Sequence, residues 1–115
     1  MEKSFAQGSE NILKDFEEWF DRVGRSSLKS PGLFNIEHIF HPIDNHYYCL
    51  KIDFDSKNLI ARLTLWEEKS VYLEAIDLKN DENFINENCF FSNLNELINT
   101  VLLFMSKLND KENSA

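Results

Sequence analysis

The sequence predicts an α+β fold: a four-stranded antiparallel meander sheet, with a fifth strand left open, carrying an N-terminal and a C-terminal helix packed on one face. Two observations predict it. Apolar residues alternate with period two along consecutive short segments, and they recur at three- and four-residue steps in one segment near each end. At 115 residues, the chain is long enough for a real hydrophobic core, so we expect one domain over residues 1–115.

The first helix is predicted over residues 9–23. From Asn11 to Val23 the apolar side chains recur at helical spacing, acidic residues take the other side, and Gly24 ends the pattern. Residues 25–32 are rich in serine and include a Pro-Gly pair, which is typical of a connector.

Four strands are predicted over residues 33–41, 47–54, 59–66 and 71–78. The last two form the clearest hairpin, because two alternating arms flank a short polar turn. Placing Leu65 opposite Val71 gives one aliphatic face and sets Arg62 against Glu74 on the other. The charge pair supports this register.

Apolar alternation also suggests a register for the earlier strands, with Phe34 opposite Phe54 and Phe54 opposite Leu59. A slip of one residue would turn each apolar face against a charged one, so the pattern favours this register or one shifted by an even step. A row of charged residues then crosses the sheet and is expected to stabilise it: Glu37, Lys51, Arg62 and Glu74.

On this register three aromatic residues gather at one end of the exposed sheet face: Tyr47, Trp66 and Tyr72. Two carboxylates, Glu67 and Glu68, follow Trp66 in the adjacent turn. Aromatic side chains rimmed by charge are what protein interfaces use as anchors. The alternative is that the connector or residues 84–91 fold over the aromatics and hide them.

The C-terminal part is predicted to be mainly helical. Residues 84–91 form either a short edge strand or an irregular loop. Ser92 is the expected N-cap of a helix over residues 93–108, which carries a broad apolar stripe. The polar residues 109–115 are expected to form a frayed tail.

The composition is acidic, with 20 Asp and Glu against 12 Lys and Arg and a net charge of −8. Nucleic acid is therefore not an expected partner, and a basic protein is easier to accommodate. No apolar run approaches the length that spans a bilayer, and residues 1–4 do not begin a signal peptide, so we expect a cytoplasmic protein without membrane contact. Cys49 and Cys89 are expected to be reduced.

We predict no catalytic residues, no metal and no cofactor. His38, His41, His46 and Cys49 lie within a short span, but His38 and His41 are three apart on a strand and should point to opposite faces. The three glycines do not form a phosphate-binding loop, and no serine or cysteine belongs to a recognisable catalytic motif. The chain is therefore not expected to be an enzyme.

Three features of the second half carry a family resemblance: the strand Ala61–Glu67 that ends in Trp-Glu, the segment Glu74–Asp77, and the closing helix around 94–108. In these features the chain resembles the TriTu family of bacterial immunity proteins. The resemblance implies protection from a secreted antibacterial toxin with ADP-ribosyltransferase activity that modifies elongation factor Tu. The turn Glu67–Ser70 replaces the Ser-Gly type of turn associated with relatives.

Together these observations predict a monomeric immunity protein, rather than a homodimer, that binds and occludes a cognate toxin. The expected contact residues are Trp66, Glu67, Glu68, Tyr72, Tyr47 and Glu74. A small acidic secretion chaperone that binds an extended effector segment is the alternative, which a tight homodimer would favour. A small enzyme or metal-binding domain comes third.

Overall fold

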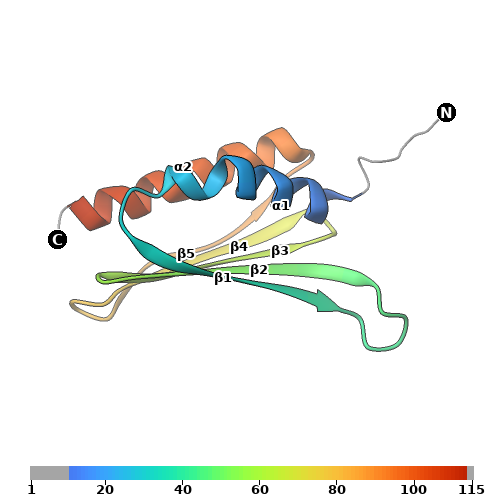
Figure 1. Ribbon diagram of the computed structural model, residues 1–115, viewed down its shortest axis with the longest axis horizontal. Coiled ribbons are helices and arrows are strands. Elements are labelled where there is room, and N and C mark those ends of the chain that lie inside the picture. The colour runs from blue at the N-terminus through green and yellow to red at the C-terminus, as the bar shows by residue number, and fades with distance from the viewer. Residues whose placement is uncertain (1–10, 114–115) are drawn as a thin grey trace.

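The computed structural model describes residues 11–113 and confirms the α+β fold (Figure 1). The elements in chain order are α1 (Ile12–Arg22), the short 3₁₀ helix η2 (Gly24–Ser27), β1 (Gly32–Phe40), β2 (Tyr47–Ser56), β3 (Leu59–Trp66), β4 (Ser70–Asp77), β5 (Glu82–Phe90) and α2 (Leu94–Asn113). The five strands pair in sequence order as an antiparallel meander, and both helices lie on the same face of the sheet. The segment that the sequence left open is the edge strand β5.

The hydrophobic core lies between the helices and the sheet face that they cover. The largest fully buried side chains come from α1, α2 and the three central strands: Phe16, Phe20, Leu13, Leu50, Leu59, Leu65, Leu73, Leu97, Leu108, Val71 and Val101. In each strand these residues alternate with side chains on the opposite, open face. Burial on one face therefore fixes which side chains the other face presents.

The hairpin of β3 and β4 has the predicted register. Leu65 pairs with Val71, Arg62 pairs with Glu74, and Trp66 pairs with Ser70 at the turn. The turn is Glu67–Glu68–Lys69, in which Lys69 has a positive φ of 72° and donates its backbone N–H to the Trp66 carbonyl.

The predicted register between β2 and β3 is wrong by two residues. Phe54 lies opposite Ala61 rather than Leu59, because β2 continues to Ser56 and the turn to β3 is two residues shorter than expected. The Ser56 hydroxyl accepts the backbone N–H groups of Asn58 and Leu59, at 3.3 and 3.2 Å, and holds the tight turn. The even shift keeps the apolar residues on the buried face.

This shift also corrects the predicted row of charges. Lys51 lies opposite Thr64, and Arg62 lies between Asp53 on β2 and Glu74 on β4. Arg62 donates Nε to Asp53 Oδ1 at 2.6 Å and Nη2 to Oδ2 at 3.2 Å, and this hydrogen bonding raises the pKa of Arg62. The bidentate pair stabilises the middle of the open face.

The helix starts are set by asparagine caps. The Asn11 side chain accepts the Lys14 N–H ahead of α1, and residues 9–10 of the predicted helix lie outside the described residues. In α2 the cap is Asn93 instead of the predicted Ser92: Asn93 Oδ1 accepts the Glu96 N–H at 2.9 Å. The Glu96 carboxylate in turn accepts the Ser92 N–H at 2.7 Å, which completes a capping arrangement.

The predicted frayed tail is wrong for residues 109–113, which continue α2 to Asn113. Asn109 donates its side-chain amide to the Ser27 carbonyl at 2.8 Å, and Glu112 accepts hydrogen bonds from Ser56 and Asn58. These contacts hold the last turns of the helix on the domain. Residues 114–115 of the predicted tail lie outside the described residues.

Replacing Phe16 by Ala tests whether α1 is an integral part of the core. Phe16 is 0% exposed, so its loss should lower the free energy of unfolding by about 3–5 kcal/mol in urea denaturation. Leu33→Ala is the control, because Leu33 is 78% exposed on the open face and its loss should cost less than about 0.5 kcal/mol. Equal effects of the two substitutions would contradict the layer arrangement.

Candidate functional site

The open face of the sheet is not hidden by either of the segments that could have covered it. Residues 82–90 form β5 in the plane of the sheet. The connector lies against α2, because the Lys29 N–H is donated to Asn109 Oδ1 at 2.9 Å and Asn109 contacts Ser27. Within residues 11–113, both helices lie on the other face (Figure 1).

One row of side chains crosses all five strands at the end of the open face near the β3–β4 turn: Ile39, Cys49, Trp66, Ser70 and Phe90. We call this set the apolar row. Trp66 is partly exposed and stands between Cys49 and Ser70, which are only 3% and 7% exposed. Phe90, at the β5 end of the row, is 77% exposed. The row therefore presents two large aromatic side chains on one face.

Sequence reasoning missed Phe90, since it did not assign residues 84–91 to a strand. A signal was present in the Phe90–Phe91 pair, because adjacent residues at a strand end point to opposite faces. Phe91 is 7% exposed and belongs to the core, whereas Phe90 is open to solvent.

The β3–β4 turn places two carboxylates beside Trp66. Glu68 is exposed. Glu67 donates its backbone N–H to the Tyr48 carbonyl at 3.1 Å, and its Oε1 lies 2.6 Å from His46 Nε2. Glu67 thus joins this turn to the β1–β2 loop.

Tyr72 and Glu74 lie further along β4 on the open face. Both are half-buried. Tyr72 donates its hydroxyl to Asn86 on β5, and Glu74 lies opposite Arg62. Their polar groups therefore have neighbours within the sheet, while their remaining surface faces outward.

Tyr47 does not join Trp66 and Tyr72, which corrects its predicted place on the exposed sheet face. Trp66 lies opposite Cys49, and a β-bulge shifts the pairing so that Phe40 faces Tyr47 instead of Tyr48. An extra residue reverses the alternation of a strand, so the Tyr47 ring packs on the helix side. It lies 5.3 Å from the ring of Phe40 and 5.4 Å from that of His38.

Three connections meet at the same end of the domain: the β1–β2 loop, the β3–β4 turn and the β5–α2 link (Figure 1). We call this the loop end, residues 40–47, 66–70 and 90–93. The Phe91 N–H is donated to the Lys69 carbonyl at 3.2 Å, which holds the last two connections together. Phe40 and Ile43 are 47% and 88% exposed at this end, where Phe40 lies on the helix side against Tyr47.

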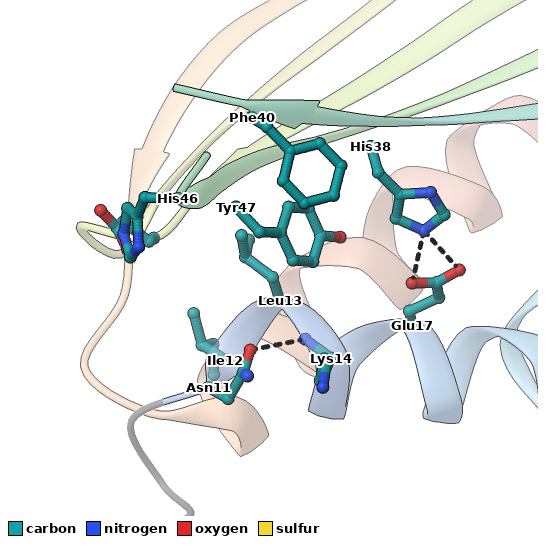
Figure 2. Close-up of a pocket in the computed structure, with 10 residues that line it drawn as sticks. Asn11, Ile12, Leu13, Lys14, Glu17, His38, Phe40, His46 and Tyr47 are labelled. Carbon is teal, nitrogen blue, oxygen red and sulfur yellow. Dashed lines mark hydrogen bonds and ion pairs between the residues drawn. The ribbon is translucent and has the colours of Figure 1, made fainter. Parts of the chain in front are cut away.

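A cleft of about 490 Å³ lies at the loop end on the helix side, between the start of α1 and the first two strands (Figure 2). Its lining comes from α1, β1, β2, the β1–β2 loop and the β3–β4 turn: Asn11, Ile12, Leu13, Lys14, Glu17, His38, Phe40, His46, Tyr47 and Glu67. His38 Nε2 lies 2.9 Å from both carboxylate oxygens of Glu17 and so ties β1 to α1. The buried hydroxyl of Tyr47 has no hydrogen-bond partner among the described residues.

The remaining reactive side chains do not assemble into a centre. Within residues 11–113, no three His, Cys, Asp or Glu side chains are grouped so that they could hold a metal ion. Cys49 and Cys89 are free thiols on strands separated by two others, and burial raises the pKa of both, the opposite of what activates a cysteine nucleophile. No helix in the described part of the chain is long and apolar enough to cross a membrane.

An open sheet face with exposed aromatic side chains beside carboxylates is typical of a protein-binding domain. Comparison with known families gives a more specific assignment. The family model described as Immunity protein TriTu matches residues 14–107, which is most of the chain, so the chain belongs to the TriTu immunity protein family. The match covers the sheet, most of α1 and α2 as far as Lys107. No curated protein matches the sequence.

The burial of Tyr47 predicts that its hydroxyl ionises at a higher pH than an exposed tyrosine. Burial, and next the Glu17 carboxylate, raise the pKa of Tyr47 above the ordinary value of about 10. In a spectrophotometric titration, the tyrosinate absorbance of Tyr47 is the part that Tyr47→Phe removes. This part should therefore appear only above pH 10. Since the unfolded chain ionises first, Tyr47 should also lower folding stability as pH rises past 10. Appearance of this absorbance at or below pH 10 would contradict the burial of Tyr47.

Proposed function

We propose that the chain protects its bacterial host by binding a cognate secreted toxin and occluding its active site. Family membership supports an immunity function, and such a function requires a toxin as partner. The resemblance favours an ADP-ribosyltransferase toxin. Protection by occlusion needs no chemistry from the immunity protein, so we propose a monomeric cytoplasmic binding protein that is not itself an enzyme.

The single observation that carries this proposal is the apolar row of the open face. Trp66 and Phe90 lie on one face at the loop end, with Glu67 and Glu68 at the adjacent turn. Large aromatic side chains in the middle of an interface supply most of the binding free energy, while acidic side chains at the rim speed encounter and select a basic partner. The net charge of −8 suits a partner with a basic active-site groove.

The contact set of the proposal differs from the one predicted by sequence alone. It keeps Trp66, Glu67 and Glu68 at its centre and Tyr72 and Glu74 at its margin, and it adds Phe90. Tyr47 leaves the set for the open face, because it lies on the helix side.

Trp66→Ala tests the anchor. The substitution should weaken toxin binding by at least about 2 kcal/mol in calorimetry, the scale of an interface hot spot, because the indole is the largest side chain in the row. The toxin for this test is to be sought in the reading frames that neighbour the gene for this chain. Unchanged affinity in a variant that melts like the parent would remove Trp66 from the interface.

Phe90→Ala and Leu33→Ala form a matched pair that tests which end of the open face binds. Phe90 and Leu33 are 77% and 78% exposed on this face, at opposite ends of the sheet. Phe90→Ala should lower toxin affinity by about 1 kcal/mol or more, and Leu33→Ala should leave it unchanged. The reverse order would move the interface to the far end of the sheet, and equal losses would spread it over the whole face.

A further inference from the structure

The cleft on the helix side of the loop end has the features of a site for a cation. The charged side chains that line it are two carboxylates, Glu17 and Glu67, and one lysine, Lys14. The two carboxylates stand on different elements, α1 and the β3–β4 turn. Their side chains are 24% and 42% exposed, so a ligand can reach them.

Glu17 has hydrogen-bonding capacity left over. Both of its oxygens lie 2.9 Å from the same atom, His38 Nε2, which can donate at most one proton. A carboxylate accepts about four hydrogen bonds, and because His38 occupies the edge between the two oxygens, the outer lone pair of each oxygen is left for a further N–H donor. Glu17 can therefore still accept hydrogen bonds from a cationic ligand while it keeps its contact with His38.

Aromatic rings form the wall next to this carboxylate. The rings of Phe40 and Tyr47 lie 5.3 Å apart and are inclined by 36°, and His38 packs edge-on against Tyr47 (Figure 2). Phe40 is 47% exposed, so its ring is accessible. A planar cation gains from contact with such rings, more when water is excluded.

The buried Tyr47 hydroxyl is a second, independent observation at this cleft. It lies beside the His38–Glu17 pair and has no hydrogen-bond partner within residues 11–113. Buried polar groups in folded proteins are nearly always paired, so an orphaned hydroxyl beside a cleft needs an explanation. The negative charge of Glu17 also acts on this tyrosine, which is one reason why its pKa is raised.

We propose that this cleft binds an arginine side chain of the protein partner, with the Glu17 carboxylate and the Phe40 and Tyr47 rings as its receptor. The inference rests on the proposed function, because it takes the partner to be the toxin. Glu67 lies in both the cleft and the turn that follows Trp66, so one partner could contact the apolar row and the cleft together.

The test needs no toxin. ¹⁵N-labelled full-length chain is titrated with Nα-acetyl-arginine amide and, separately, with the neutral isostere Nα-acetyl-citrulline amide, while amide shifts are followed by NMR. The arginine compound should give saturable shifts around His38, Tyr47 and Glu67, with half-saturation on the order of 1 mM for a ligand of this size. The citrulline compound should give none.

Adjacent glutamates on α1 give a matched pair of variants. Glu17→Gln should weaken arginine binding about tenfold, while Glu18→Gln, which changes an exposed carboxylate outside the cleft, should leave it unchanged. Lys14→Gln removes the competing positive charge and should bind arginine at least as tightly as the parent. Phe40→Leu keeps an apolar side chain but removes the ring, so it should weaken arginine binding a few-fold. This variant replaces Glu17→Gln as the test if Glu17→Gln destabilises α1.

Equal shifts with the arginine and citrulline compounds would mean a neutral occupant and would overturn the proposal. So would a Glu18→Gln effect as large as that of Glu17→Gln, or the absence of saturable shifts around the cleft. Each of these outcomes would leave the toxin-binding role of Trp66 and Phe90 intact, because their tests measure a different surface. Conversely, loss of that role would not change the arginine titration.

Discussion

Cross-strand register is the constraint on which both faces of this domain depend. Side chains alternate along a strand, so a register shift by an odd number of residues would turn the core side chains towards solvent. A shift by an even number leaves the buried face apolar and changes only which residues are neighbours. The observed pairing of Phe54 with Ala61 keeps Leu50 against Leu65 inside. On the outside it brings Trp66 beside Cys49 and so assembles the apolar row.

The same distinction explains how much could be predicted from the sequence. The assignment of most strand residues to faces followed from alternation, because an odd shift would bury Arg62 or Glu74, and the pairing of these two charges then selected the β3–β4 register. The β2–β3 register did not follow, because turns of two and four residues fit the alternation equally well. The side chain of Ser56 selects the shorter turn through local hydrogen bonds. The bulge that moves Tyr47 to the helix side was not predicted, because it has no signature in the alternation of apolar and polar residues.

Contacts between distant segments account for the other differences. α2 runs to Asn113 because Glu112 bonds with Ser56 and Asn58, which lie far away in the sequence. At the loop end, Glu67 has a comparable linking role: it bonds with His46, lines the cleft, and follows Trp66 of the apolar row. An aromatic surface on one face and an acidic cleft on the other therefore share one turn. The two proposed contact surfaces therefore lie at one end of the five-stranded sheet.

Amide hydrogen exchange with and without toxin is the sharpest test of whether the toxin binds the loop end. Exchange reports on each backbone segment separately, so it locates the contact without any substitution. Protection on binding should concentrate in residues 40–47, 66–70 and 90–93. Protection confined to the outer side of α2, or to residues 57–58 and 78–81 at the opposite end of the sheet, would contradict it.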